Sequence, residues 1–445
     1  MKRNLFLVML LIAVVFVAWT GGQKGPAAGK EMAVDFWHHE SPTHRVDAFQ
    51  KVIDDFQKSN PNVTVTQHVV PWGDSITKVM ASLAANNPPD FIFSYPIHTI
   101  TLYKTNSIIP LDELVKEIDQ KHSYIPGQAE LLRYKGNYWG APVFTMMYAL
   151  SYRPSFLEKY AAAKNPPKTW DEFLEIAKKC TVDTNGDGKT DLYGIALGAA
   201  KNLFTSQQIY TLMINARSFI YDKEGKVIFN SPETVRALTF YKQLSQYAPP
   251  GITAWAWGEQ ELSFASDQTA MMMGNGMPDA RRFMEMKNYD IAATEQPYPP
   301  DGVRGGVSYV NNVCIFKKAQ DRGSYETVRQ FINFMMLPEN NTPLANMEPF
   351  GFLPVTKTAM EYEGYWKDPM IAQLADSGRA VLNSIQYGQL MGLEHGGWVN
   401  LAIAEVDGSS ILAEIAQKVY VNDLSPKEAA KWGHEQIQKI TDAAK

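Results

Sequence analysis

The stretch "MAVDFWHHESPTHRVDAFQKVIDDFQKSNPNVTVTQHVV", residues 32–70, decides the fold of this chain. Its first residues, 32–37, alternate in polarity as a half-buried strand does, and 62–70 read as a second strand. Between them the apolar residues recur on one face of a helix, at Val46, Phe49, Ile53 and Phe56. A strand, a helix and a second strand in this order predict a parallel βαβ unit.

The same alternation continues beyond residue 70. Ser41 is expected to cap the first helix with Pro42 at its first helical position, and Asp74 is expected to open a second helix. A third, fully apolar strand, "DFIFS", follows at 90–94. The pattern therefore predicts an α/β fold with a parallel, doubly wound sheet.

Aromatic and polar side chains gather at the predicted strand ends, where ligands of such sheets bind. They are Trp37, His38, His39 and Glu40 after the first strand, Trp72 after the second and Tyr95 after the third. A sugar ring has an apolar C–H face and a rim of hydroxyls, and aromatic and planar polar groups match both. Two alternatives stay open: the histidines form a solvent-facing turn, or the tryptophans belong to the core.

Length, composition and net charge limit the classes of protein to which this chain can belong. The chain has 445 residues, 45% of them hydrophobic, which is enough for two or three globular domains. A net charge of -5 gives no basic field for nucleic acid. Cys180 and Cys314, far apart in sequence, are expected to be free, buried thiols rather than a disulfide framework.

The N-terminus, residues 1–30, has the layout of a secretory signal followed by a linker. Lys2 and Arg3 precede an apolar run over 5–19, and small, flexible residues follow it. We therefore expect an exported protein, periplasmic or at the cell surface. A retained membrane anchor is the alternative. No cysteine follows the apolar run, so lipid attachment is not expected.

A second α/β unit is expected after "GAPVFTMMYALSYR", residues 140–153, with helices at 169–180, 204–216 and 231–245, a strand "YGIAL" at 193–197 and a buried strand from 308. In this order the chain resembles the extracellular solute-binding proteins of bacterial ABC importers, specifically the maltose-binding-protein-like sugar family. The resemblance covers essentially everything after the linker. Its landmarks are "FQKSNPNVTV", "PPDFIFS", "YKGNYWGAPV", "LSYRPSFLEKY", "PPKTWDEFLEIAKK", "FASDQTAMMMGNG", "FINFMMLPENN" and "GFLPVTKTAM".

The resemblance implies two α/β lobes joined by hinge crossovers, with the ligand held in the cleft between them. The N-terminal lobe would comprise residues 31–141 and 309–345, and the C-terminal lobe 145–305 and 346–445. The implied function is capture of a di- or oligosaccharide or sugar derivative and its delivery to the membrane permease. The implied protein is a monomer and not an enzyme.

Further ligand-binding residues are expected from the C-terminal half. Trp257 precedes a Gly-rich turn that contains Asn275, where backbone can approach a ligand closely. By its order in the chain Trp398 matches a ligand-stacking tryptophan of the resembled family, and Met146 falls where that family carries a sugar-binding acid. Arg281 could pair with the carboxylate of a uronate or glycerate, or could be an exposed helix arginine.

The loop "DTNGDGKTD", residues 183–191, has the ligand rhythm of a calcium site. Its oxygen donors are the side chains of Asp183, Asn185, Asp187 and Asp191 and the backbone carbonyl of Lys189. Counted from Asp183 as position 1, position 12 is Gly194, whereas an EF-hand has at that position a Glu that closes the calcium site. Structural calcium that stays clear of the sugar is the prediction, and a metal-free Asx/Gly turn is the alternative.

Two rival functions use the same features. A secreted glycoside hydrolase needs two carboxylates that flank the scissile bond, and at the predicted strand ends Glu40 stands alone. A carbohydrate-binding lectin would bind without a large change in shape.

Overall fold

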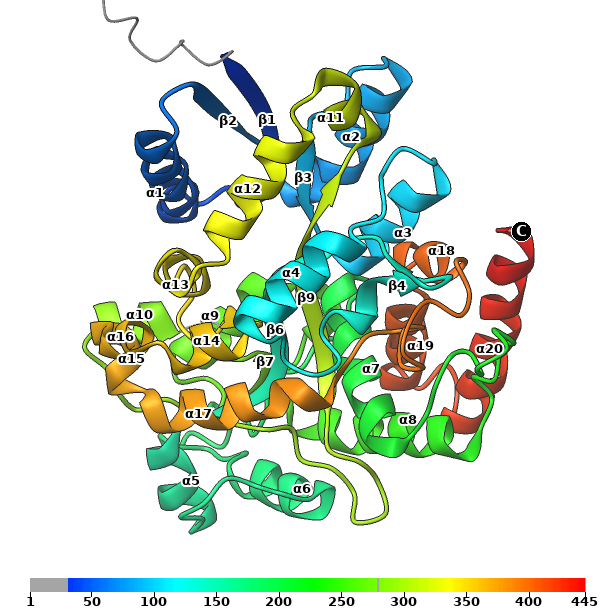
Figure 1. Cartoon of the computed structure of the whole chain (residues 1–445). Helices are drawn as coiled ribbons and strands as arrows, with labels where there is room; N and C mark the ends of the chain where they lie inside the picture. The colour runs from blue at the N-terminus through cyan, green and yellow to red at the C-terminus, as the bar shows by residue number, and fades with distance from the viewer. Residues whose placement is uncertain (1–30, 278–279, 445) are drawn as a thin grey trace, which may run out of the picture.

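The computed structural model describes residues 31–277 and 280–444, so the predicted signal and linker lie outside the described residues. One nine-stranded sheet and a two-stranded ribbon run through the molecule (Figure 1). The strands are β1 Met32–His38, β2 Val63–Val69, β3 Phe91–Ser94, β4 Arg133–Tyr134, β5 Asn137–Tyr138, β6 Ala141–Tyr152, β7 Met271–Asn275, β8 Ala292–Thr294, β9 Gly306–Ile315, β10 Leu353–Pro354 and β11 Gly388–Gln389.

Helices cover the sheet in both halves of the molecule. They are α1 Thr43–Ser59, α2 Ser75–Ala84, α3 Pro96–Lys104, α4 Asp112–His122, α5 Pro154–Ala161, α6 Trp170–Lys179, α7 Leu203–Ala216, α8 Pro232–Leu244, α9 Trp257–Ala265, α10 Ala280–Glu285, α11 Lys317–Arg322, α12 Tyr325–Met335, α13 Pro338–Ala345, α14 Lys357–Glu361, α15 Glu363–Lys367, α16 Pro369–Gln373, α17 Ala375–Ser384, α18 Ile403–Gly408, α19 Ile411–Tyr420 and α20 Pro426–Ala443. Short 3-10 turns are η1 Trp72–Asp74, η2 Glu130–Leu132, η3 Ser245–Tyr247, η4 Ile252–Ala254 and η5 Ile385–Tyr387.

The sheet combines parallel and antiparallel strand pairs. Strand β1 lies between β2 and β3 and pairs with both in parallel, as the sequence pattern predicts. Strand β9 then pairs antiparallel with β3, and β6 pairs antiparallel with β9. The sheet is therefore mixed, because the long strand β9 runs antiparallel to both β3 and the long strand β6, whereas it pairs in parallel with the short strand β11.

Those two long strands connect the two lobes. The first half of β6 pairs with β9 and with β10, whereas its last residues, 148–152, pair with β7 and β8. In Figure 1, β1, β2, β3 and α12 lie above this crossing, and α5 to α8 lie below it. Because the chain passes between the lobes along these strands, each lobe is expected to consist of segments that are not consecutive in the sequence.

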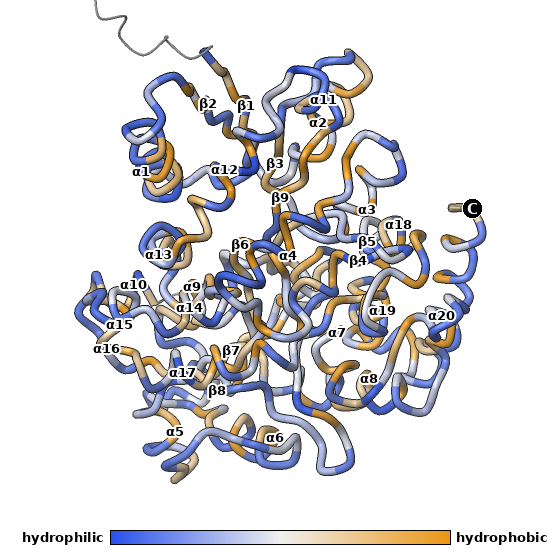
Figure 2. Tube along the Cα trace, in the orientation of Figure 1, coloured by the Kyte–Doolittle hydropathy of each residue, from blue (hydrophilic) through white to orange (hydrophobic). Residues whose placement is uncertain are grey.

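The N-terminal lobe, which contains β1, β2, β3 and α12, is the upper lobe in Figure 1, and its core is built from aromatic rings on the strands. The Phe36 ring stacks on the Phe91 ring with centroids 4.4 Å apart, and Phe331 of α12 meets both edge-on or tilted. Met347, Phe352 and other residues near 350 also pack into this cluster. Figure 2 shows apolar residues along β3, β9 and the inner helix faces.

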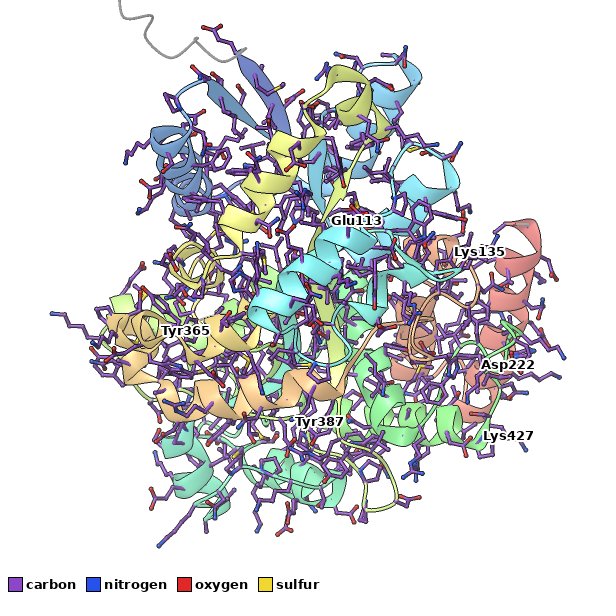
Figure 3. All side chains as sticks on the ribbon, viewed as in Figure 1. Glu113, Lys135, Asp222, Tyr365, Tyr387 and Lys427 are labelled. Atoms are coloured by element: carbon purple, nitrogen blue, oxygen red, sulfur yellow. The ribbon has the colours of Figure 1, made fainter. Side chains whose placement is uncertain are left out.

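The C-terminal lobe, which contains α5 to α8, is the lower lobe in Figure 1, and the larger hydrophobic core lies there. Trp170 of α6 stacks on Phe240 of α8 at 4.1 Å and 10°, and α7 is buried on nearly all sides. Thr169 and Glu172 form a capping box that starts α6, so this helix begins where the sequence predicts. Side chains fill the space between the helices and the strands (Figure 3). Tyr365, for example, has no exposed surface.

Two local expectations are wrong and a third is confirmed. Helix α1 begins at Thr43, because Pro42 has ψ 138°, outside the helical region, and Ser41 makes no cap. The segment 193–197 forms only isolated parallel bridges, Tyr193 with Thr269 and Ala196 with Met272, instead of a strand. Cys180 and Cys314 are free and buried, as predicted, and burial raises the pKa of both thiols to about 12.

Within residues 31–277 and 280–444, no helix has the length and apolar character needed to cross a membrane. The boundaries that the sequence predicts for the lobes stay a prediction.

Candidate functional site

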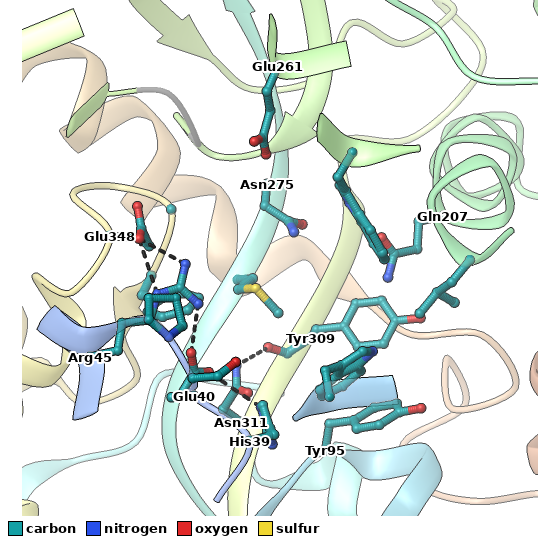
Figure 4. Close-up of a pocket in the computed structure, with 18 residues that line it drawn as sticks. His39, Glu40, Arg45, Tyr95, Gln207, Glu261, Asn275, Tyr309, Asn311 and Glu348 are labelled. Carbon is teal, nitrogen blue, oxygen red and sulfur yellow. Dashed lines mark hydrogen bonds and ion pairs between the residues drawn. The ribbon is translucent and has the colours of Figure 1, made fainter. Parts of the chain in front are cut away.

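A cavity of about 470 Å³ opens where the carboxyl ends of the strands meet the lower lobe. Both lobes and both crossing strands contribute to its wall (Figure 4). Its lining residues are His39, Glu40, Ser41, Pro42, Arg45, Trp72, Tyr95, Met146, Leu203, Gln207, Trp257, Glu261, Asn275, Tyr309, Asn311, Glu348, Gly351 and Phe352. It is the shape expected of a binding site for a small molecule: concave, partly apolar and with a few convergent polar groups.

An aromatic wall comes from the upper lobe. The ring centroids of Trp72 and Tyr95 lie 4.7 Å apart, and the His98 ring lies behind them, 4.1 Å from Tyr95 and 5.6 Å from Trp72. Burial, with a smaller contribution from His39, lowers the pKa of His98 to about 3, so its imidazole is neutral at physiological pH. A neutral ring can support these aromatic faces without placing a charge beneath a ligand.

A charged triad forms the floor next to this wall. Arg45 of α1 donates from Nη1 to Glu40 Oε2 at 2.7 Å and from Nη2 to Glu348 Oε1 at 2.8 Å. Burial alone would raise the pKa of Glu40, but the hydrogen bond and charge of His39 and the Arg45 guanidinium outweigh it and lower the pKa to about 2. Glu40 is therefore ionised and held in place.

The opposite wall comes from the lower lobe. Trp257 and Glu261 lie on α9, and Asn275 ends β7, where it pairs with Tyr148. Gln207 of α7 accepts a hydrogen bond from the Tyr148 hydroxyl at 2.6 Å, which fixes its amide beside the cavity. The Oδ1 atom of Asn275 is buried and has no hydrogen-bond partner in the described structure, which marks it as an acceptor that a ligand can satisfy.

The crossing strands supply the cavity's base. Met146 of β6 stands opposite Tyr309 of β9 in the register, and Asn311 follows two residues later on the same face of β9. Burial, with the Asp407 and Tyr95 charges adding to it, raises the pKa of the Tyr309 phenol well above its ordinary value. Its hydroxyl therefore stays protonated and able to donate.

The structure brings seven of the residues selected from the sequence to this one cavity. They are His39, Glu40, Trp72, Tyr95, Met146, Trp257 and Asn275. Their role in ligand binding stays a prediction. The remaining four, Trp37, His38, Arg281 and Trp398, are not among the residues that line it.

Strand geometry explains the first two of these. Side chains of a strand alternate between its faces, so Trp37 packs beneath α2 beside Val79 and Ile92. His38 points the other way, its ring 4.7 Å from Phe49 and its Nε2 2.8 Å from Gln67 Oε1. Both therefore belong to the packing of β1 against its helices.

The other two are engaged elsewhere. Arg281 donates to the backbone carbonyls of Asn346 and Met347, so its guanidinium secures the chain before β10. Trp398 is 4% exposed and donates from its indole nitrogen to Leu131 O at 2.9 Å. Tyr134 stacks on the Trp398 ring at 5.6 Å. The two glycines before Trp398 give the turn its backbone freedom, since both have positive φ.

Sequence reasoning missed several lining residues. They are Arg45, Gln207, Glu261, Tyr309, Asn311 and Glu348. Tyr309 and Asn311 lie in a strand that reads as buried throughout, and Gln207 in a helix that is almost wholly buried. A polar residue inside an apolar segment is the signal that could have found these three.

The loop at 183–191 directs its side chains onto its own backbone. Asp183 accepts from the amides of Gly186 at 2.6 Å and Gly188 at 2.7 Å, and Asp191 accepts from Thr184. These hydrogen bonds lower the pKa of Asp183, with that from Gly188 contributing most. In the part of the chain that the structure describes, no three His, Cys, Asp or Glu side chains are grouped to hold a metal ion. This arrangement fits a self-closed Asx turn, and calcium binding stays a prediction.

Comparisons with known proteins agree with this architecture. A family model described as "Bacterial extracellular solute-binding protein" matches residues 42–342. The chain is 24% identical over 426 residues to the "Putative ABC transporter periplasmic-binding protein YcjN" of Escherichia coli (strain K12), which covers 94% of this chain and 95% of that protein.

Two solved structures share the fold at low sequence identity. One is a cyclic alpha-maltosyl-1,6-maltose binding protein from Arthrobacter globiformis, with a TM-score of 0.76 and 16% identity over 92% of this chain and 99% of that one. The other is maltose-bound T. maritima MalE3, with a TM-score of 0.75 and 18% identity over 92% and 100%. Both likenesses support a two-lobed α/β fold with a curled sheet.

Proposed function

Because the chain belongs to the bacterial extracellular solute-binding proteins, we propose that it is the exported, monomeric binding protein of an ABC importer and captures a saccharide in the cavity between its lobes. The observation that carries the proposal is the facing arrangement of Trp72 and Tyr95 from one lobe and Trp257 from the other around one space. Flat aromatic faces match the C–H face of a sugar ring, and Gln207 and Asn275 match its hydroxyls.

Two of the similar structures support the ligand class, since their names state that they bind maltose or a cyclic maltosyl-maltose. The name of the relative from Escherichia coli supports the partner, an ABC transporter. Lobe closure around the hinge strands β6 and β9 would bury the ligand and present both lobes to the permease.

The ionisation of Glu40, one of three carboxyl residues that line the cavity, does not suit a glycoside hydrolase. Hydrolysis needs a carboxylic acid with a raised pKa to protonate the leaving group. Glu40 has a pKa lowered to about 2 and is held by Arg45, which suits a hydrogen-bond acceptor and not a proton donor. We therefore propose that the ligand leaves the site unchanged.

The first prediction tests capture without turnover. In a melting-temperature screen against neutral, amino and acidic mono- and disaccharides, at least one saccharide should raise the transition, since a ligand that binds only the folded state stabilises it by mass action. The same mixtures, analysed for products after prolonged incubation, should contain only the starting sugar. Sustained release of product would place the protein among the hydrolases.

A second prediction concerns calcium at 183–191, which the spacing of oxygen donors motivates. If the loop holds calcium, adding calcium to EDTA-treated protein raises the melting temperature, and Asp187→Ala removes that rise while saccharide affinity stays unchanged. Asp222→Ala, in a different exposed turn, serves as the control because Asp222 also accepts backbone hydrogen bonds. Identical melting in calcium and in EDTA would leave the metal-free turn as the explanation.

A further inference from the structure

Two glutamine side chains in the core of the lower lobe form a network of buried hydrogen bonds. Gln208 of α7 is 0% exposed and Gln260 of α9 is 1% exposed. Gln208 Nε2 donates to Gln260 Oε1 at 3.3 Å and to the Met273 carbonyl at 2.9 Å, and Gln260 Nε2 donates to the same carbonyl at 2.8 Å. The two side chains therefore join α7 and α9 at one backbone oxygen of β7.

The remaining hydrogen-bonding groups of both side chains bind the segment that precedes α7. The backbone N–H of Gly198 donates to Gln208 Oε1 at 2.8 Å, and Gln260 Nε2 donates to the Ala196 carbonyl at 3.3 Å. Each glutamine thus uses both of its N–H donors and its oxygen inside the protein. A buried polar network that is fully satisfied favours one arrangement of the elements that it joins.

Each of the three elements also carries a side chain of the cavity's lower wall. On α7, Gln207 directly precedes the glutamine of the network. On α9, Trp257 lies three residues before the other glutamine, so the two are neighbours on the helix surface. On β7, Asn275 follows the shared carbonyl by two residues. Figure 4 shows Gln207 and Asn275 at the cavity, from different elements.

The two network glutamines act from behind this wall. Neither Gln208 nor Gln260 is among the residues that line the cavity, so a ligand there would not contact them. Apolar side chains of similar volume can also fill a core, but such cores lose their unique arrangement before they lose stability. The network therefore specifies how the three elements lie relative to one another, in addition to filling space.

From this placement we propose that Gln208 and Gln260 are positioning residues of the saccharide site, which hold α7, α9 and β7 at the separations that a bound sugar requires. Without the network, part of the free energy of binding would be spent on ordering these elements. The inference rests on the proposed saccharide function and adds to it two residues that set affinity without touching the ligand.

The test compares Gln260→Met with Tyr221→Phe by chemical denaturation and by titration calorimetry, at a temperature where both variants are folded. The probe is maltose or, if maltose does not bind the wild type, the disaccharide that raises the melting temperature most in the screen. Gln260→Met keeps the volume and removes the amide, so it should raise the dissociation constant roughly tenfold or more. Tyr221→Phe is the control: it removes a buried hydrogen bond to Thr441, away from the lining residues, and should leave affinity unchanged.

Two further variants separate positioning from a general loss of stability. In a Trp257→Ala background, Gln260→Met should weaken binding less than it does in the wild type, because part of its effect passes through the missing indole. Gln260→Glu has the same shape, and burial keeps its carboxyl protonated, with one donor and one acceptor. Its affinity should lie between those of Gln260→Met and the wild type.

The outcomes distinguish this role from the saccharide function itself. Wild-type affinity in folded Gln260→Met, or an equal loss in both backgrounds, would overturn the positioning role and leave saccharide capture standing. If Gln260→Met does not fold, Gln260→Glu decides in its place, and wild-type affinity in that variant would overturn the role. If no saccharide of the screen binds the wild type, the proposed function fails, and the positioning role fails with it.

Discussion

Replacing Trp398 with Ala should destabilise the folded protein by about 3–5 kcal/mol and leave saccharide affinity near that of the wild type. The indole is 4% exposed, stacks on Tyr134 and meets Tyr103 edge-on at 5.8 Å. Truncation of a buried tryptophan removes its packing and leaves a cavity, which typically costs this much. It would also leave the Leu131 carbonyl without its donor.

Chemical denaturation and calorimetry on the same variant separate the two roles that Trp398 could have. A large fall in the free energy of unfolding with intact affinity is the expected pair of results. Near-normal stability with affinity weakened tenfold or more would return Trp398 to the binding site. Trp398→Phe, which keeps an aromatic ring, should recover part of the stability if the loss is one of packing.

Replacing Asp407 with Asn should stabilise the protein at alkaline pH. Burial raises the pKa of Asp407 from 3.8 to about 7. In the unfolded chain the group ionises near pH 4, whereas in the folded protein it keeps its proton until about pH 7. Stability from this group is therefore lost as the pH rises from about 4 to about 7, and above that the loss is complete.

Asparagine has nearly the same shape and no charge, so it removes this penalty. The variant and the wild type should have similar free energies of unfolding near pH 4, and the variant should be more stable at pH 8 by an amount on the order of 3 kcal/mol. Denaturation curves at both values of pH measure the difference. Asp376→Asn, at an exposed position on α17, is the control. A difference that does not change with pH would contradict the burial of a neutral acid at Asp407.

The sequence was informative where local pattern determines structure. Strands β1 to β3 and their parallel pairing follow from polarity that alternates over a few residues, and so does the position of Glu40 and Tyr95 at strand ends. Chain order alone was less informative about the direction of a side chain. Trp398 has the expected residue type near the expected place, but its ring turns inward onto Tyr134.

Contacts between distant segments could not be read from the sequence. Glu348 reaches Arg45 across 303 residues of chain, and this ion pair decides the electrostatics of the cavity floor. The loop at 183–191 shows a related limit. Its acidic spacing suits a cation, yet the same side chains can satisfy their own backbone amides, as Asp183 does with Gly186 and Gly188.

The most direct test of saccharide capture between the lobes is a calorimetric titration of the tightest-binding saccharide from the screen into the wild type, Trp257→Ala and Trp398→Ala. We predict one site per chain in the wild type. Loss of the half-buried Trp257 face should raise the dissociation constant roughly tenfold or more, by analogy with aromatic platforms that contribute on the order of 1–3 kcal/mol, whereas Trp398→Ala should bind like the wild type. Unchanged binding by Trp257→Ala, or no binding of any saccharide by the wild type, would contradict a saccharide site in this cavity.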